Sequence, residues 1–360
     1  MLGIAWVDEN GGYRRTADRP FADLADFPPL DYSLIQAERY TAYGYPNIKR
    51  QFGMISSKGC PFSCTFCFNS EFHRCRRRMY PREVLFQQIK TLTENYGVDR
   101  VAFIDEIFGV DKQELKAFCQ GMTDRFPGFT WGADTRVGVL TREDMEMMYA
   151  NGCRSLTFGL ESGSAEMRKV LRKDFDDTKV DEAFRNCREV GFRTNAYFML
   201  GLPDETPEQL RETVRLYFRT QPNWGVWFLY WPIPGSQLYR ELEAAGRISV
   251  PTTLEAAAAH NTLTDQDLAK NYSRIPDKDL QVVQNFVNWQ TVFRQRGYVK
   301  IAVSLLLSNL RRIGLRGLAR ELWVSAKLLC TVAWYAHAYP SIRKKYDLYA
   351  KNYGRTDWDD

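Results

Sequence analysis

Apolar and polar positions alternate in blocks through the central part of the chain. Short apolar runs predict strands near 53–57, 100–105, 129–135, 154–160, 193–200 and 224–230. Amphipathic runs predict helices near 81–96, 111–125, 141–151, 164–171, 177–191, 207–220 and 236–246. Strands that alternate with helices are typical of βα units with a parallel sheet. Six such units favour an α/β fold whose sheet is closed, or partly closed, into a barrel.

Individual residues mark several of the helix boundaries. Thr141 and Thr206 stand directly before acidic first turns and can cap the helices that follow. Gly97, Gly152 and Gly191 come just after predicted helix ends, where a left-handed conformation is common.

The segments on either side of this pattern have a different character. Residues 1–50 form an N-terminal extension, in which the apolar residues 4–7 and 13–16 flank Asn10-Gly11-Gly12 and predict a small hairpin. We place the α/β core at 51–247 and a helical region at 248–360. Residues 297–347 carry nine Lys or Arg against two Asp or Glu. We interpret the stretches 298–310 and 315–338 as a helical cap on the barrel, with peripheral contact to a membrane or an apolar substrate as the alternative.

Composition and charge exclude several classes of protein. The 360 residues are 44% hydrophobic and 26% charged, which is typical of a globular protein with a large core. A net charge of +5 is too small to indicate nucleic-acid binding. No basic segment followed by an apolar run opens the chain, and no run of 18 uncharged apolar residues occurs. We therefore expect a cytoplasmic protein, with a peripheral position at the inner membrane face as the alternative.

Three of the eight cysteines, Cys60, Cys64 and Cys67, crowd into a loop after the first predicted strand with the spacing C-x3-C-x2-C. Three thiolates on one loop can hold three irons of a [4Fe–4S] cluster and leave the fourth iron open to a small molecule. A structural zinc site, with His73 or Cys75 as a fourth ligand, is the alternative. The remaining cysteines are expected to be small buried hydrophobes without a second cluster: Cys75, Cys119, Cys153, Cys187 and Cys330.

The cysteine loop resembles the signature of the radical S-adenosylmethionine (SAM) enzymes, with Phe66 in its aromatic position. That resemblance implies a partial or full (β/α)6 barrel, a [4Fe–4S] cluster, and SAM bound to the unique iron. Further segments resemble the cobalamin-associated branch in their order along the chain: 103–108, 159–164, 199–206 and 232–236. The resemblance covers about residues 1–247. Because that branch usually carries an N-terminal cobalamin domain, and this chain begins where the linker after it would lie, we expect cobalamin to be absent or supplied by another domain or chain.

The resemblance also implies which residues contact SAM at the strand ends. They are Asp105 and Glu106 for the ammonium, Glu161 and Ser162 for the ribose or methionine, Met199 and Gly201 for the adenine, and Pro232 to close the pocket. Arg136 follows the third strand, where its guanidinium could pair with the SAM carboxylate or an acidic substrate group. Structural alternatives are a loop cap for Asp105 and ion pairs for Arg136 and Glu161. Candidate substrate-lining aromatic residues are Tyr197, Trp227, Tyr230 and Trp231.

The function implied by the resemblance is reductive cleavage of SAM to a 5′-deoxyadenosyl radical, which abstracts hydrogen from a substrate C–H bond. We expect a non-methylating outcome: cyclisation, rearrangement, desaturation or C–C bond formation. Cobalamin-dependent methyl transfer is the first alternative, and a metal-stapled binding module is an alternative of another class. The expected partners are a small-molecule substrate, large and hydrophobic or anionic, and a reductant such as flavodoxin or ferredoxin.

Overall fold

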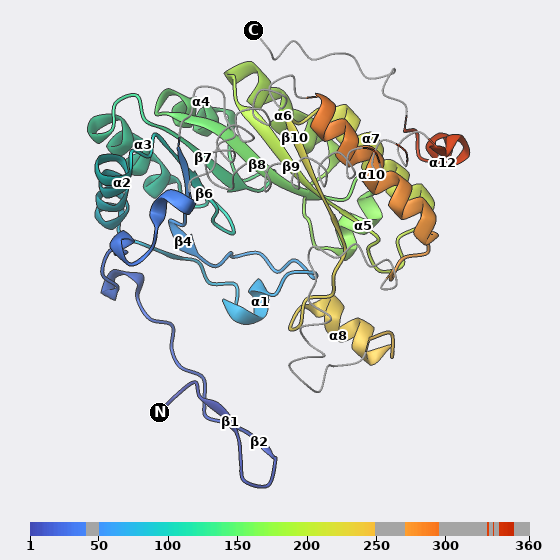
Figure 1. Cartoon of the computed structure of the whole chain (residues 1–360), viewed down its shortest axis with the longest axis horizontal. Helices are drawn as coiled ribbons and strands as arrows, with labels where there is room; N and C mark the ends of the chain where they lie inside the picture. The colour runs from blue at the N-terminus through green and yellow to red at the C-terminus, as the bar shows by residue number, and fades with distance from the viewer. Residues whose placement is uncertain (41–49, 249–270, 295–329, 331–333, 335–337, 349–360) are drawn as a thin grey trace, which may run out of the picture.

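The computed structural model describes residues 1–40, 50–248, 271–294, 330, 334 and 338–348. Six parallel strands form its central sheet in the order β10-β9-β8-β7-β6-β3 (Figure 1). Their bounds are β3 Gln51–Met54, β6 Arg100–Phe103, β7 Thr130–Thr135, β8 Cys153–Glu161, β9 Arg193–Leu200 and β10 Trp224–Leu229. In the described part of the chain β3 and β10 do not pair with each other. The (β/α)6 barrel predicted from the sequence is therefore confirmed in its partial form.

Helices follow the strands and cover one face of the sheet (Figure 1). They are α2 Arg82–Tyr96, α3 Lys112–Arg125, α4 Arg142–Ala150, α5 Ala165–Val170, α6 Asp177–Val190, α7 Pro207–Thr220 and α8 Gln237–Ala244. Thr141 and Thr206 form capping boxes at the starts of α4 and α7. Gly97 and Gly191 end α2 and α6 in the left-handed conformation. These elements confirm the predicted helices to within about two residues.

The two faces of the sheet differ in polarity. Toward the helices, residues such as Phe103, Trp131 and Phe158 are fully buried in the main core. On the opposite face, Arg100 is buried as well, donating from Nε to Gln51 Oε1 at 2.7 Å and from Nη2 to Ser155 Oγ at 2.5 Å. Alternation along each strand produces this division, because successive side chains point to opposite faces. The polar face is the inside of the partial barrel.

The start of the core differs from the sequence prediction. We predicted the first strand at 53–57, but β3 ends at Met54. A two-residue strand, β4 Ser57–Lys58, follows and pairs antiparallel with β5 Arg78–Met79. Two-residue strands leave no periodic signal in a sequence. Their pairing brings together the two ends of the segment that carries the three cysteines and the short helix α1 Asn69–Phe72.

Outside the core, the predicted N-terminal hairpin is present as β1 Ala5–Val7 paired with β2 Tyr13–Arg15. Three 3₁₀ turns, η1 Leu24–Asp26, η2 Tyr32–Leu34 and η3 Ala37–Tyr40, connect it to the core. The described C-terminal elements are helical: α10 Asp277–Arg294, which packs against β10, and α12 Pro340–Lys345. The predicted helical cap at 298–310 and 315–338 falls almost entirely outside the described residues. None of the described helices has the length and apolar character needed to span a bilayer.

Candidate active site

The three cysteines lie in the loop between β4 and α1, and all three are half-buried. Burial, with a smaller contribution from the neighbouring thiols Cys64 and Cys67, raises the pKa of the Cys60 thiol to about 11. The thiols are therefore close enough to interact electrostatically. Nowhere in the described ranges do three His, Cys, Asp or Glu side chains form a group that could hold a metal ion. Three thiols on one loop nevertheless provide the donor set for three separate irons of a cluster.

The middle of this loop is held against two helices at the carboxyl edge of the sheet. Thr65, which is buried, donates from its backbone N to Leu171 O at 3.3 Å and from Oγ1 to Val170 O at 2.8 Å. Its carbonyl accepts from Leu238 N at 2.9 Å. The end of α5 and the start of α8 therefore fix the peptide that follows Cys64.

The start of the loop depends on Gly59, which has φ +89°. A Cβ at this position would clash with the carbonyl oxygen of Arg76 on the returning arm of the loop. Gly59 N donates to Glu106 Oε2 at 3.2 Å, and Glu106 Oε1 lies 3.4 Å from His73 Nε2. Glu106 thus ties both arms of the loop to the end of β6. Its predicted contact with SAM stays a prediction.

The Asp105 carboxylate binds residues at the connection between β3 and β4. Its buried carboxylate accepts from Ser56 N at 3.0 Å, from Ser56 Oγ at 2.9 Å and from Ser57 Oγ at 2.5 Å. Burial raises the pKa of Asp105, and the serine hydrogen bonds act in the opposite direction. This arrangement supports the alternative in which Asp105 caps the loop.

Arg136 joins the cysteine loop to the segment after α5. Its Nη1 donates to Cys64 Sγ at 3.3 Å, and its guanidinium lies 4.3 Å from the centroid of Phe62. Its Nη2 reaches Arg172 O at 3.2 Å and Asp174 Oδ2 at 3.5 Å. The guanidinium thus contacts the sulfur of one of the three loop cysteines and links it to the segment after α5.

Glu161 ends β8 with φ +62°, an unusual conformation for a residue other than glycine. It forms an ion pair of 3.0 Å with Lys173, whose side chain is 7% exposed against 10% for Glu161. Lys173 Nζ also donates to Gly159 O at 3.1 Å, and a Cβ at Gly159 would lie 2.6 Å from Glu161 Oε1. The structural ion pair weighed for Glu161 is thus present. Backbone strain of this kind is typical of functional sites.

Among the other predicted SAM contacts, Ser162, Gly201 and Pro232 follow β8, β9 and β10, Met199 lies within β9, and Phe66 lies in the cysteine loop. Ser162 is fully buried and its Oγ lies 3.2 Å from Thr213 Oγ1, so it packs inside the fold. Met199 and Phe66 both pack at the border of a second apolar cluster formed around Leu202 and Leu238. Gly201 has φ +73°, and Pro232 is buried. The structure therefore brings Phe66 and Met199 to one cluster, whereas the Ser162 side chain packs against Thr213.

Sequence reasoning assigned no role to two buried ionisable side chains at this edge, Lys173 and Glu205. Glu205 Oε2 accepts from Gly201 N at 2.8 Å and Leu202 N at 3.2 Å. Its Oε1 is buried and has no hydrogen-bond partner in the described part of the chain. Burial raises the pKa of Glu205 to about 8, so the group is neutral at pH 7. Both residues stand in polar loop sequence, where nothing signals burial.

Inside the partial barrel, Tyr197 OH lies 3.3 Å from Asp134 Oδ2. Burial raises the pKa of Asp134 to about 6, while hydrogen bonds from Thr157 and Tyr197 lower it. Tyr197 is thus on the polar face, as expected for a residue that lines a substrate. The prediction for Trp227 is wrong, because Trp227 stacks on Phe198 at 4.3 Å in the core beneath α7.

The scattered cysteines also divide into two groups. Cys119, Cys153 and Cys187 are fully buried, as predicted. Cys75 is only half-buried, with its Sγ 3.7 Å from Phe62 O, and Cys330 is exposed. The expectation of burial is therefore wrong for Cys330.

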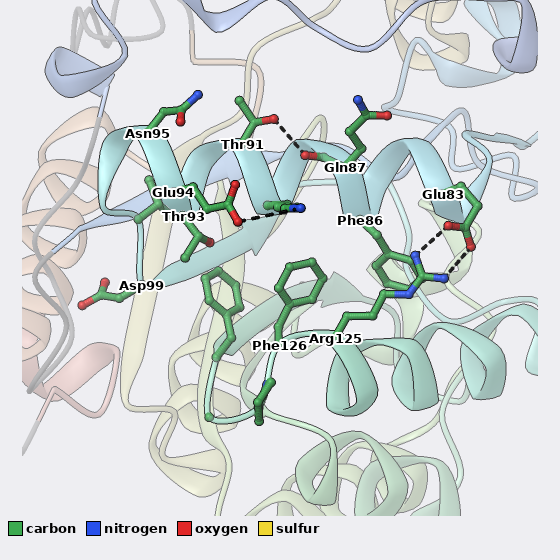
Figure 2. Close-up of a pocket in the computed structure, with 15 residues that line it drawn as sticks. Glu83, Phe86, Gln87, Thr91, Thr93, Glu94, Asn95, Asp99, Arg125 and Phe126 are labelled. Atoms are coloured by element: carbon green, nitrogen blue, oxygen red, sulfur yellow. Dashed lines mark hydrogen bonds and ion pairs between the residues drawn. The ribbon is translucent and has the colours of Figure 1, made fainter.

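A groove of about 1110 Å³ lies at the opposite, amino-terminal edge of the sheet (Figure 2). Its walls come from α2, from the end of α3 and from the starts of β6 and β7. Figure 2 shows Arg125 reaching across to the carboxylate of Glu83 over Phe86. None of the cysteine-loop residues lines this groove.

Comparison with known families identifies the core. Residues 54–217 match the model of the radical SAM superfamily. The core of this chain is therefore similar to the radical SAM superfamily. The family implies a [4Fe–4S] cluster and SAM as its cofactors, and the three-cysteine loop fits that cluster.

Curated relatives extend the comparison. An uncharacterized methyltransferase, PH0819, of Pyrococcus horikoshii is 27% identical over 66% of this chain and 51% of its own length. An anaerobic magnesium-protoporphyrin IX monomethyl ester cyclase of Rubrivivax gelatinosus is 28% identical over 67% of this chain and 43% of its own. The chain thus spans about half the length of these relatives, or less.

Solved structures of low identity share the fold. The cobalamin-dependent SAM radical enzyme OxsB, with aqua-cobalamin and SAM bound, aligns with a TM-score of 0.59 at 14% identity. That alignment covers 91% of this chain and 51% of OxsB. The radical SAM methyltransferase TsrM from Kitasatospora setae aligns with a TM-score of 0.54 at 17% identity, over 69% of this chain and 50% of TsrM.

Proposed function

We propose that this chain is a radical SAM enzyme that abstracts hydrogen from a substrate C–H bond. The observation that carries the proposal is the loop of Cys60, Cys64 and Cys67, held at the carboxyl edge of a partial barrel with a polar interior. When bound, the cluster and SAM supply a 5′-deoxyadenosyl radical. Active sites of parallel β/α barrels lie at this edge, where residues from several strands converge on one ligand.

The chain's own residues would position these groups. Arg136 would orient the Cys64 side chain through its contact with the sulfur, and Thr65 would hold the loop in place through its hydrogen bonds to α5 and α8. We propose that SAM lies along the ends of β8 and β9, between Glu161 and the turn at Gly201, with Met199 against the adenine and Pro232 closing the pocket. Phe66, packed in the same cluster as Met199, would exclude water from this slot. Asp134 and Tyr197 would then face the substrate.

We further propose a large hydrophobic or anionic substrate and a non-methylating outcome such as cyclisation. The relative from Rubrivivax gelatinosus supports both, because its name describes cyclisation of a tetrapyrrole ester. Cobalamin-dependent methyl transfer is the second candidate, supported by the cobalamin-bound structures that share the fold. In that case another domain or chain would supply the cobalamin.

The test is an assay of nucleoside products from anaerobically reconstituted protein given SAM and dithionite, with and without hydroxocobalamin. We expect 5′-deoxyadenosine from wild type and from Cys75→Ala, and none from Cys64→Ala, which loses a cluster ligand. The Cys75 variant is the matched control, because it removes a half-buried thiol that the proposal does not use. Cobalamin-dependent S-adenosylhomocysteine would favour methyl transfer. Cleavage retained in Cys64→Ala would refute the proposal, and loss of metal in Cys75→Ala would favour the zinc alternative.

A further inference from the structure

The end of α5 connects the surface of the molecule to the cysteine loop. Val170 and Leu171 supply the two carbonyl oxygens that accept from Thr65, the residue next to Cys64. Leu171 is fully buried, whereas Val170 is 47% exposed. Two hydrogen bonds and one peptide therefore separate a solvent-exposed segment from a proposed cluster ligand. The end of α5 lies beside the light-blue loop that leads into α1 (Figure 1).

Basic residues around Val170 are divided between the interior and the surface. Arg168 and Lys173 are buried and pair with Asp177 and Glu161. Lys169 and Arg172 are exposed. We call Lys169, Val170 and Arg172 the 169–172 surface.

Two acidic residues lie near this surface in the sequence. Glu166 accepts from Gln209 Nε2 at 2.9 Å, and Asp174 lies 3.5 Å from Arg136 Nη2, but both remain exposed. The 169–172 surface itself carries two cations, Lys169 and Arg172, and one exposed aliphatic side chain, Val170.

The backbone at Arg172 gives an independent indication. Lys173 N donates to Arg168 O at 2.8 Å and Arg172 N donates to Lys169 O at 3.0 Å, the two bonds of a Schellman helix end. Arg172 has φ +53° in the position where glycine is usual. The chain therefore keeps a charged side chain at a position that glycine would occupy with less strain.

We propose that the 169–172 surface is the docking site for an acidic electron-transfer protein that reduces the cluster. This inference rests on the proposed function, in which each reductive cleavage consumes one electron from outside the chain. The donor protein loses that electron, and the cluster held by Cys60, Cys64 and Cys67 gains it. Lys169 and Arg172 would attract an acidic face, and Val170 would make the central apolar contact. Electron-transfer encounters use small interfaces, which suits a surface of a few residues.

The experiment compares two reductants on the same reconstituted protein. We expect Lys169→Glu/Arg172→Glu to weaken binding of an acidic bacterial flavodoxin at least tenfold, measured by titration of its flavin fluorescence at low salt. Flavodoxin-driven formation of 5′-deoxyadenosine should fall in parallel, while dithionite-driven formation stays unchanged. The matched control is Lys116→Glu on α3, an exposed lysine far along the chain from the cysteine loop, which should leave both unchanged.

A second variant separates docking from folding. Arg172→Gly should be at least as stable to heat as wild type, because glycine relieves the left-handed backbone, yet it should bind flavodoxin more weakly. Unchanged flavodoxin affinity in both variants would overturn the proposal, as would an equal loss of the dithionite-driven rate. A wild type that cleaves no SAM with dithionite would instead refute the proposed function, and the titration would still decide the docking site.

Discussion

The two edges of the central sheet carry their charged residues in different ways. At the carboxyl edge several ionisable groups are buried: Lys173 pairs with Glu161, Asp105 is held by serines, and Glu205 is fully enclosed. At the amino-terminal edge the groove is bordered by exposed pairs. Arg125 lies 2.6 Å from Glu83 with 45% and 74% of the side chains exposed. Arg100 is the buried exception there, satisfied by Gln51 and Ser155.

This difference indicates at which edge the chain tolerates groups that lower its stability, as functional sites often do. A buried charge costs desolvation that its partner barely repays, whereas an exposed pair costs and gains little. Perturbed titratable groups cluster at functional sites for the same reason. The groove at the amino-terminal edge is therefore a poor guide to the active site. The buried ionisable groups point to the cysteine edge instead.

The largest loss of stability is expected from Lys173→Met at the carboxyl edge, because this substitution leaves Glu161 buried without its partner. We expect the free energy of unfolding to fall by about 3–5 kcal/mol, measured by urea denaturation under anaerobic conditions. The double variant Lys173→Met/Glu161→Gln should recover most of that loss, because no isolated charge remains. Equal stability of the single and double variants would contradict the account.

A smaller effect is expected from Glu205→Gln and depends on pH. Burial raises the pKa of Glu205 from 4.5 to about 8, so the folded chain holds a proton that the unfolded chain has released. Wild-type stability should therefore fall as pH rises from about 4.5 to 8. Between pH 6 and pH 9 the loss should exceed that of Glu205→Gln by roughly 2–3 kcal/mol. Parallel pH profiles of unfolding in the two proteins would show that Glu205 is ionised in the folded state.

The smallest effect should come from the amino-terminal edge. Glu83→Gln removes an exposed ion pair and should cost less than about 1 kcal/mol, as seen by thermal unfolding. Formation of 5′-deoxyadenosine with dithionite should be unchanged, because the groove lies at the other end of the strands. A tenfold loss of that activity would mean that the two edges are coupled.

Much of the fold follows from local patterns. The six strands and the helices between them appear near their predicted positions, because apolar periodicity and caps such as Thr141 and Thr206 act over a few residues. The cysteine loop is visible in the sequence for the same reason. Its spacing is local.

The features that the sequence did not predict depend on contacts between residues that are distant in the chain. Lys173 and Glu205 carry no sequence sign of burial, and the β4–β5 pairing joins segments about twenty residues apart. The sequence does not show that Trp227 faces the helices rather than the barrel interior. The reason is that β10 is apolar at almost every position, so alternation does not fix which side chains point inward.

The account rests on a cluster with one iron open to SAM at the cysteine edge. Electron paramagnetic resonance of the reconstituted, dithionite-reduced protein tests this most directly, with spectra recorded before and after SAM is added. We predict a reduced [4Fe–4S] signal that SAM changes, and that is absent from Cys64→Ala. Protein that holds zinc without iron, or a cluster signal that SAM leaves unaltered, would contradict it.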